Sequence, residues 1–534
     1  MQTLNNVSNN NSKYITALFI FLLVVYVVLG QFLIWNIPYT FPFGGPDELM
    51  HLSMADYISK HLSWPRWDSL EVVRNDYGVT YSAGGSIVYW LHGLSYKLFG
   101  HHRIGAFLML LLYLALSIVL YRKNRLAGFL LLAGLFPQTL FIFSYVNSDT
   151  GTIVTAVLLG MSVGAFVSGE ANIKSFLILF FFAGMAVTAR QHLWAIALIT
   201  LIWAVIYKRK AIYQYDKKIW IWAIFIALIP ASWWFITSFI ANDGDILGVF
   251  TNAKSIVQFG KPDLLSTAIP WSDIILYDFV YGTLTSLYAK WGWLRLGLHD
   301  YQYMMVATVA VLIMVLMYKN VNKKVFLFFI GLLATNFGFM LLYSVAYDYQ
   351  PQGRYLFPSV YVILGIMSTV LIKKKVFSKM LLSLLILLAV LNTYYSIKLT
   401  LFNYMDFFIE RPVLSDKVSE KYYKHGYFVI DRLQISEGKL EFRGWAFDRK
   451  TDKPFKDIQL MLKNNNNEFY KVELESESRP DVVSLVKNSA LRSSGFTTRL
   501  VDLMPLKKGT YKYLLRVDID GNPMFLDINK TLNR

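Results

Sequence analysis

Two acidic side chains and a histidine follow the first long apolar run of the chain, within residues 43–51 (FGGPDELMH). Proline after two glycines fits the first turn of a helix, because proline lacks the amide hydrogen that has no partner there. Asp47 and His51 then share one helix face, with Glu48 three residues before the histidine. Such a group can deprotonate a hydroxyl, or hold Mg²⁺ or Mn²⁺ through Asp47 and Glu48. The alternative, in which the acids only complement the positive end of a helix dipole, explains neither the histidine nor the glycines.

The composition of the chain shows what kind of scaffold must position these side chains. Of 534 residues, 55% are apolar and only 16% are charged, against about 25% charged in a typical soluble domain. Apolar runs long enough to cross a hydrocarbon core of about 30 Å recur through the first 400 positions. This pattern excludes a soluble enzyme, a fibrous protein and a disordered protein. The absence of cysteine excludes disulfides, thiolate metal sites and a cysteine nucleophile.

The apolar runs predict an α-helical polytopic membrane protein with about eleven transmembrane helices. The first run is too long for a signal peptide and no small-residue cleavage site follows it, so it is expected to remain as a helix. The predicted spans are 14–35, 104–121, 126–143, 151–168, 175–189, 192–207, 219–241, 303–318, 325–346, 355–372 and 380–399. The run 86–99 is amphipathic and is expected to lie at the outer surface.

Basic residues divide the loops into two sets. Clusters around residues 122–125, 174, 208–218, 319–324 and 373–375 fall in alternate loops, which the positive-inside rule places in the cytoplasm. The net charge of +17 therefore reflects membrane topology, and nucleic acid is not expected as a partner. This assignment predicts a multi-pass protein of the cell membrane with a cytoplasmic N-terminus. The opposite loops, which hold nearly all the unusual polar residues, and the tail after residue 400 are then extracytoplasmic.

The tail has a different pattern. Apolar residues alternate from about residue 425, as in 511–519, and polar turns separate the short segments. We expect strands at 427–434, 439–447, 457–463, 468–474, 495–501, 509–519 and 523–528, forming a β-sandwich over 425–534. Residues 1–400 are then the membrane domain, and 401–424 are a linker.

Four short elements resemble those of a bacterial family of polytopic membrane proteins related to the GT-C glycosyltransferases. The first is Pro46-Asp47-Glu48 with His51 after the first span. The others are residues 145–149 (YVNSD) at a helix end, 291–293 (WGW) in the large outer loop and 352–358 (QGRYLFP) opening a late helix. In the tail, residues 442–448 (FRGWAFD) resemble a strand of small β-domains attached to polysaccharide enzymes, which implies an accessory module with Trp445 in its core.

The resemblance implies a sugar donor linked to a polyprenyl phosphate, used at the outer face of the membrane. The acceptor is then an outer cell-envelope glycan, such as teichoic acid, capsule or wall polysaccharide. An acidic residue of the first outer loop serves in this family as base or metal ligand, and Asp47 is the first choice, with Glu48 the alternate. No glycine loop of the nucleotide-binding type is present in the sequence, which agrees with a lipid-linked donor.

Sugar transfer also requires positive charge to stabilise the leaving phosphate. The outward candidates are Arg354, Arg190, His192, Lys290 and Arg295. Arg354 opens a late span, where a lipid headgroup would lie and where an arginine can grip phosphate through two N–H groups. The alternatives are interfacial snorkelling for Arg354, a polar connection between spans for Arg190 and His192, and membrane anchoring for Lys290 and Arg295.

Further substrate-binding candidates come from the remaining elements of the resemblance. They are Gln352 and Tyr355, Asn147 and Asp149, and Trp291 and Trp293. Asn147 and Asp149 can orient sugar hydroxyls, complete a metal site or cap the following helix. Trp291 and Trp293 can stack on sugars or belong to the interfacial aromatic belt.

Two other function classes remain open. A transporter or flippase of lipid-linked oligosaccharide would place ionisable groups at the bilayer midplane, whereas the polar residues here gather at one surface. A non-catalytic envelope assembly scaffold would use the aromatic loops for assembly alone. We expect a glycosyltransferase.

Overall fold

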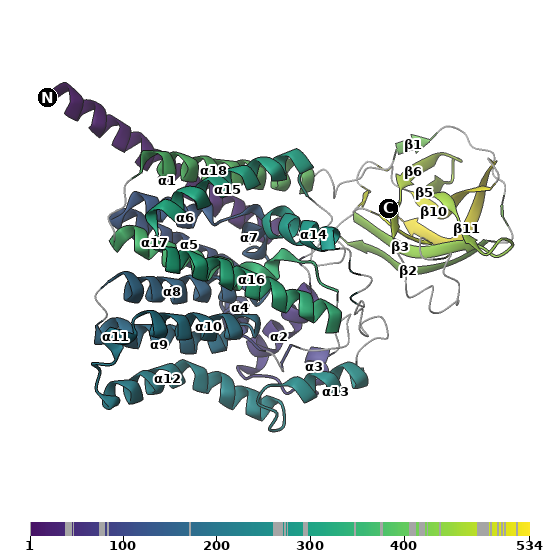
Figure 1. The fold of residues 1–534 in the computed structure, drawn as a ribbon. Coiled ribbons are helices and arrows are strands. Elements are labelled where there is room, and N and C mark those ends of the chain that lie inside the picture. The colour runs from purple at the N-terminus through teal and green to yellow at the C-terminus, as the bar shows by residue number, and fades with distance from the viewer. Residues whose placement is uncertain are drawn as a thin grey trace. The chain divides into compact units, whose positions relative to one another are not determined.

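The computed structural model describes most of the 534 residues. Its described residues are 2–37, 45, 47–73, 81–82, 85–169, 172–259, 271, 274, 276–291, 297–346, 349–373, 378–404, 413–415, 422–423, 426–436, 439–477, 491, 494–498, 501–503, 506, 509–519 and 522–533. The chain divides into two compact units, Met1–Thr400 and Leu401–Arg534. The first is helical and the second is built from strands (Figure 1).

The first unit is a bundle of long apolar helices with short helices around them. Its elements are α1 Gln2–Asn36, α2 Glu48–His61, α3 Leu70–Val73, α4 Val88–Phe99, α5 Ile104–Lys123, α6 Arg125–Ala133, α7 Pro137–Ile142, α8 Asp149–Ser168, α9 Ile173–Thr188, α10 His192–Tyr207, α11 Arg209–Ile212, α12 Lys217–Ala241, α13 Val249–Phe259, α14 Leu276–Ala289, α15 Asp300–Asn320, α16 Lys323–Ala346, η3 Gly353–Leu356, α17 Phe357–Lys373, α18 Lys379–Ile397 and η4 Lys398–Tyr404. Within the described residues, eight helices are long and apolar enough to cross a membrane, and α9 and α10 are apolar but shorter. The predicted helical membrane architecture is confirmed.

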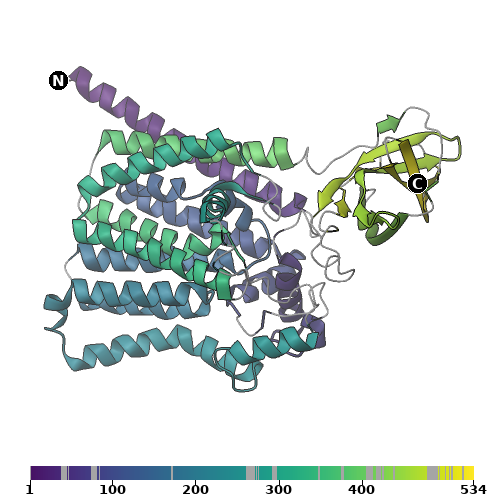
Figure 2. The ribbon, with the colours of Figure 1, turned by 45° about the vertical axis from the view of Figure 1, so that its right-hand side comes forward.

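The long helices run side by side (Figure 2), and successive passes of the chain alternate in direction when the short helices α6 and α7 are taken together as one pass. The short helices α2, α3, α13 and α14 gather at one end of the bundle, which we call the α2 end, and α11 lies at the opposite end (Figure 1). The helices α8, α10 and α17 therefore begin at the α2 end. The loops with basic clusters, such as those around Lys123 and Lys208, lie at the other end.

The segment 126–143, predicted as one span, differs from that prediction because it is two short helices. The helix α7 begins with Pro137, whose ring cannot continue the preceding helix and which lacks an N–H donor. The interruption leaves backbone carbonyl groups that need partners in an apolar interior. Distant side chains supply them: Tyr26 donates to the carbonyl of Leu135 at 3.1 Å, and Asn392 donates to that of Ala133 at 2.7 Å.

The amphipathic run 86–99 forms α4, as expected for a helix. Its buried face includes Val88, Tyr89 and His92, and it packs on α2 and α5. Gly93 of α4 lies close to the carbonyl oxygen of Ala55 in α2, so the two helices approach without an intervening side chain. This approach fixes α2 relative to α4.

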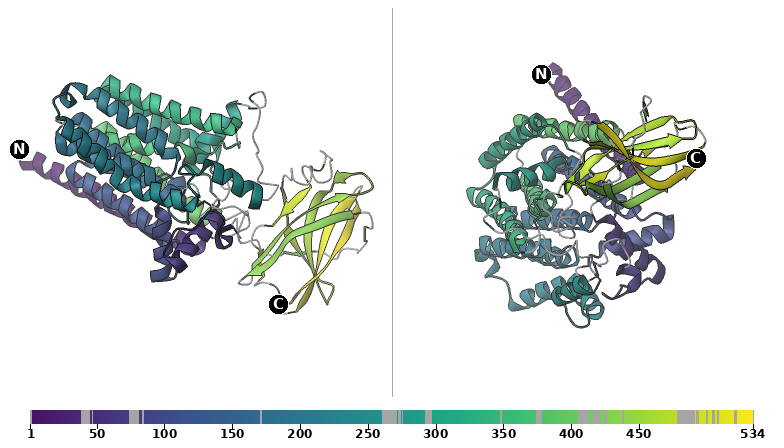
Figure 3. Two further views of the ribbon diagram at one scale, coloured as in Figure 1. Left: turned by 90° about the horizontal axis from the view of Figure 1, so that it is seen from below. Right: turned by 90° about the vertical axis from the view of Figure 1, so that its right-hand side faces the viewer.

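The second unit contains two antiparallel sheets (Figure 3). Its strands are β1 Val413–Ser415, β2 Gly426–Ser436, β3 Lys439–Asp448, β4 Lys453–Pro454, β5 Lys456–Asn464, β6 Phe469–Glu473, β7 Glu475–Glu477, β8 Gly495–Thr497, β9 Val501–Asp502, β10 Thr510–Ile519 and β11 Asn522–Asn533. One sheet has the order β1-β6-β5-β10-β11, and the other has the order β2-β3-β8-β7, with β4 and β9 paired to β3. Strand β1 lies within the segment predicted as a linker.

The core of this unit lies between the sheets. Alternate residues of β3, such as Leu440 and Phe442, pack with Leu460 of β5 and Tyr513 of β10. Trp445 lies on the opposite face of β3 and is 5% exposed, because Tyr427, Phe447 and Leu491 surround it. Trp445 is therefore buried, as predicted, although in a separate aromatic cluster.

Candidate active site

Asp47 and Arg354 meet at the α2 end although 307 residues separate them. Arg354 Nη2 lies 3.1 Å from Asp47 Oδ2, and the exposed fractions of the two side chains are 6% and 20%. Asp47 precedes α2 with φ of 61°, a left-handed conformation that aspartate tolerates better than most residues. Its carboxylate does not cap α2, and it pairs with the arginine instead.

The backbone around Arg354 is fixed by close contact with α14. A Cβ on Gly353 would lie 2.1 Å from the backbone nitrogen of Leu287, so only glycine fits there. The Gly353 N–H donates to Ser286 Oγ at 2.7 Å. The short helix η3 is thereby held against α14, and Arg354 is directed toward Asp47.

A second ion pair joins Asp149, the first residue of α8, to Arg190 in the link between α9 and α10. Arg190 Nη1 lies 2.6 Å from Asp149 Oδ1. Although burial opposes the change, the Asp149 carboxylate raises the pKa of Arg190 above its usual value, so this guanidinium stays charged. The close connection between α9 and α10 thus carries a fixed positive charge.

Tyr355 connects the two ion pairs. The guanidinium carbons of Arg190 and Arg354 lie 5.8 and 5.4 Å from the centre of the Tyr355 ring, within cation–π range. His192 stacks on the same ring, with centroids 4.8 Å apart. With Asp149, five of the predicted substrate-binding residues therefore share one site.

Several buried polar atoms of this site have no hydrogen-bond partner among the described residues. They are Nε and Nη1 of Arg354, Oδ2 of Asp149 and the hydroxyl oxygen of Tyr145. Leaving a buried donor or acceptor unpaired costs about 1–3 kcal/mol, and more when it is charged. The site thus offers two donors on one arginine beside an open acceptor on a carboxylate, which suits a ligand that carries both an anion and hydroxyl groups.

His51 lies on the same side of α2 as these charges. Its Nδ1 lies 2.5 Å from the Tyr89 hydroxyl, and its ring stacks on Tyr81 with centroids 4.6 Å apart. Burial and the positive charges of Arg190 and Arg354 lower the pKa of His51 well below its usual value. His51 is therefore a neutral imidazole held by two tyrosines.

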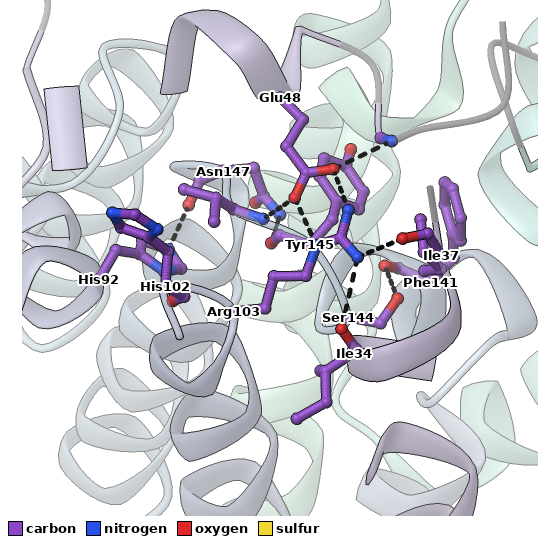
Figure 4. Close-up of polar contacts among 12 residues, drawn as sticks. Ile34, Ile37, Glu48, His92, His102, Arg103, Phe141, Ser144, Tyr145 and Asn147 are labelled. Atoms are coloured by element: carbon purple, nitrogen blue, oxygen red, sulfur yellow. Dashed lines mark hydrogen bonds and ion pairs between the residues drawn. The ribbon is translucent and has the colours of Figure 1, made fainter. Parts of the chain in front are cut away.

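Glu48 follows Asp47 in the sequence but belongs to a different cluster (Figure 4). Arg103 donates from Nε to Glu48 Oε1 and from Nη2 to Oε2, both at 2.7 Å, and both side chains are almost fully buried. The N–H groups of Val146 and Gly45 also donate to this carboxylate, at 3.0 and 3.4 Å. Arg103 Nη1 donates to the carbonyl groups of Ile34 and Ile37 at the end of α1. This cluster ties α1, α2, α5 and the residues before α8 together.

Other predicted site residues have structural contacts. Asn147 donates to the carbonyl groups of Ile142 and Tyr145 and accepts from the N–H of Thr150, so it caps the start of α8. Trp291 is fully buried, donates to the carbonyl of Pro137 at 3.0 Å and stacks on Phe141.

Four more candidates complete the comparison with the sequence. Gln352 contacts Gln350 through its side-chain amide. Lys290 is half-buried and lies 5.8 Å from the ring centre of Tyr281. Trp293 and Arg295 lie outside the described residues, as does Pro46 of the first motif.

The donor set does not fit the predicted divalent cation. Asp47 is paired with Arg354, and Glu48 is paired with Arg103 on the other side of α2. Across the described part of the chain, no three His, Asp or Glu side chains gather as metal ligands. We therefore derive no step of a reaction through a metal ion.

Sequence reasoning missed Arg103, Tyr81, Tyr89 and His92. Arg103 had a usable signal, because it precedes an apolar span on the side that otherwise lacks basic clusters. His92 links the site to its support: its ring nitrogens lie 3.0 and 3.2 Å from the carbonyl oxygens of His102 and Asn147. The two tyrosines carry no spacing signal, since α4 and the residues before it reach His51 only through tertiary packing.

Fold and site define a polytopic membrane protein with an ion-paired polar site at one end of its helical bundle. The chain belongs to the family of predicted membrane proteins designated DUF2142, which matches residues 92–364. No protein of curated function matches the chain. A similar solved structure is the crystal structure of ArnT from Cupriavidus metallidurans bound to undecaprenyl phosphate, with 16% identity and a TM-score of 0.45. The similarity covers 69% of this chain and 61% of the ArnT chain, so this chain spans less than two thirds of ArnT.

Proposed function

We propose that this protein is an integral membrane glycosyltransferase. It transfers a sugar from a polyprenyl-phosphate-linked donor to a hydroxyl of an outer cell-envelope glycan. Its N-terminus is then cytoplasmic, the α2 end and the second unit are extracytoplasmic, and the second unit is an accessory module. The basic clusters at the end opposite α2 support this orientation.

The reaction uses groups that the structure brings within reach of one another. Asp47 takes the proton of the acceptor hydroxyl, and the acceptor oxygen forms a bond to the anomeric carbon. The bond between that carbon and the phosphate oxygen breaks, and its electron pair leaves with the polyprenyl phosphate. Arg354 and Arg190 stabilise the negative charge on this leaving group, while Oδ2 of Asp149 accepts a hydrogen bond from a sugar hydroxyl.

The observation that carries the proposal is the unsatisfied Arg354. This side chain is almost fully buried, contacts a carboxylate through only one nitrogen and keeps Nε and Nη1 without a partner in the described structure. An arginine that only snorkels to the interface would place these donors in water. Buried, charged donors beside a carboxylate base instead suit an anion such as phosphate, which arginine binds through its N–H groups.

The arrangement favours an enzyme over a transporter. The three acid–arginine pairs described above, one fully buried and two partly exposed, all lie at the α2 end of the bundle. A transporter or flippase would carry such groups near the middle of its spans. A scaffold, in turn, has no need for unpaired donors in a buried site.

The deciding experiment replaces the base while keeping its size. Cells that lack the native protein receive the intact chain, Asp47→Asn or the matched control Asp56→Asn. Asp56 lies on α2, which follows Asp47, and pairs with Lys60 at the surface. We expect the intact chain and Asp56→Asn to restore one sugar component of the envelope glycan, and Asp47→Asn to leave it missing at normal levels of inserted protein.

Two results would count against the proposal. If the Asp47→Asn variant inserts into the membrane and still supports full glycan modification, Asp47 is not the base. If cells that lack the protein instead accumulate lipid-linked sugar on the cytoplasmic side while their isolated membranes keep full transferase activity, the protein is a transporter.

A further inference from the structure

The helix α13 has its polar and apolar sides in an unusual arrangement. Phe250 and Val257 point outward with 76% and 83% of their surface exposed. Thr251 and Ser255 are buried against the rest of the first unit. A surface helix of a soluble protein shows the opposite arrangement, with apolar residues inside and polar residues outside. The outward side of α13 is therefore unsuited to water.

The inward side is held by specific polar contacts. Asp245 accepts hydrogen bonds from the N–H of Gly248 at 3.1 Å and from the N–H and hydroxyl of Thr251 at 2.9 and 3.1 Å. Although burial opposes the change, these donors hold the pKa of Asp245 below its usual value, so the carboxylate is charged and fixes the start of α13. At the other end, Phe259 packs against the apolar cluster of α2, α3 and α4 that contains Tyr89. The orientation of α13 about its axis is thus determined at both ends.

The described side chains of α13 fall on three sides of the helix at 3.6 residues per turn. Thr251, Ser255 and Phe259 face the protein. Phe250, Ala253 and Val257 form an apolar side. The exposed Lys254 and Gln258 lie along the remaining flank. A helix that lies at a membrane–water interface needs these three sides, one for protein, one for acyl chains and one for water.

The apolar side continues the lipid-facing surface of a spanning helix. Near the end of α12, Ile236, Phe239 and Ile240 are 59%, 55% and 64% exposed. The connection to α13 then exposes Ile246 and Leu247. Figure 1 shows α13 beyond this end of α12, close to α3 at the α2 end of the bundle.

We propose that α13 lies in the lipid leaflet at the α2 end, with Phe250 and Val257 among the acyl chains and Lys254 in the headgroup region. The occupant of the outward face is lipid because the apolar surface is continuous with that of α12. The connection before α13 also borders the candidate site: Gln191, which follows Arg190, donates to the carbonyl of Leu247 at 3.4 Å. This proposal does not depend on sugar transfer.

The absence of cysteine from the chain makes the proposal directly testable. Single cysteines are introduced as Phe250→Cys, Val257→Cys and Lys254→Cys in the full-length protein, labelled with an environment-sensitive fluorophore and reconstituted in phosphatidylcholine–phosphatidylglycerol vesicles. Ile224→Cys, at an exposed position within α12, provides the lipid reference. Lys60→Cys, at an exposed position of α2, provides the aqueous reference.

We expect labels at positions 250 and 257 to be blue-shifted and quenched by nitroxide lipids, as at position 224. The label at position 254 should be quenched by aqueous iodide, as at position 60. Quenching by iodide at positions 250 and 257 overturns the proposal. Protection of these positions from both quenchers also overturns it, because protein would then cover the face.

Discussion

The buried Glu48–Arg103 pair predicts a strong effect on folding that is separate from chemistry. Replacing Arg103 with methionine keeps much of the apolar stem but removes both guanidinium contacts to Glu48. The carboxylate then keeps only the N–H groups of Val146 and Gly45 in a site without solvent exposure. Removing one partner of a buried ion pair typically costs about 3–5 kcal/mol. We expect Arg103→Met and Glu48→Gln each to lower the free energy of unfolding by about this amount.

The double variant distinguishes an ion pair from two independent sites. Because removing one partner already removes the interaction, Glu48→Gln combined with Arg103→Met should cost less than the sum of the single variants. We expect a coupling free energy of about 2–3 kcal/mol, at the upper end of values for contacting residues.

The assay is unfolding of the purified protein in mixed micelles of neutral detergent and SDS, followed by tryptophan fluorescence. Glu71→Gln is the control, because Glu71 pairs with His61 on the surface and should change the free energy by less than about 0.5 kcal/mol. A Glu48→Gln protein that is as stable as the unaltered one but inactive in sugar transfer would refute the structural role and return Glu48 to the catalytic group.

Three further predictions use the same unfolding assay. Gly353→Ala should lower the free energy of unfolding, because its Cβ would lie 2.1 Å from the Leu287 backbone, whereas Gly331→Ala, with nothing within 4 Å, should not. The lowered pKa of His51 means that below about pH 6.5 the unfolded chain binds a proton that the folded chain does not. Stability should therefore fall toward acid by up to about 1.4 kcal/mol per pH unit, and His51→Gln should reduce this slope. Trp291→Phe should cost about 1–3 kcal/mol, because it leaves a buried carbonyl without its donor; an unchanged midpoint would contradict that contact.

Hydropathy was enough to predict the helical membrane architecture, because length and apolar composition alone decide whether a helix can span a bilayer. It could not reveal the interruption of segment 126–143, since both α6 and α7 are apolar. Pro137 marked the position in the sequence. Tyr26 and Asn392 stabilise the interruption by donating hydrogen bonds to the freed carbonyl groups. These contacts depend on tertiary packing.

The candidate site was predictable as a set of residues but not as a set of contacts. Alternating spans placed Asp47, Asp149, Arg190 and Arg354 at one end, and the structure brings them there. The spacing of Asp47 and Glu48 could not separate their roles, because both are acids at the start of a helix. Asp47 precedes α2 in a left-handed conformation and faces Arg354, whereas Glu48 is the first residue of the helix and faces Arg103.

The Asp47–Arg354 contact has a consequence for the proposed reaction. In this contact Arg354 Nη2 occupies one oxygen of the carboxylate that the proposed reaction uses as its base. A donor phosphate competes for the same guanidinium, since Arg354 approaches Asp47 through Nη2 alone and keeps its other donors without a partner in the described structure. In the proposed reaction, a phosphate bound at Arg354 would free the Asp47 oxygen to contact the acceptor hydroxyl. The Asp149–Arg190 pair is not broken by this exchange, so it keeps the site assembled. The proposed reaction would thereby couple the donor and the acceptor through one side chain, Arg354.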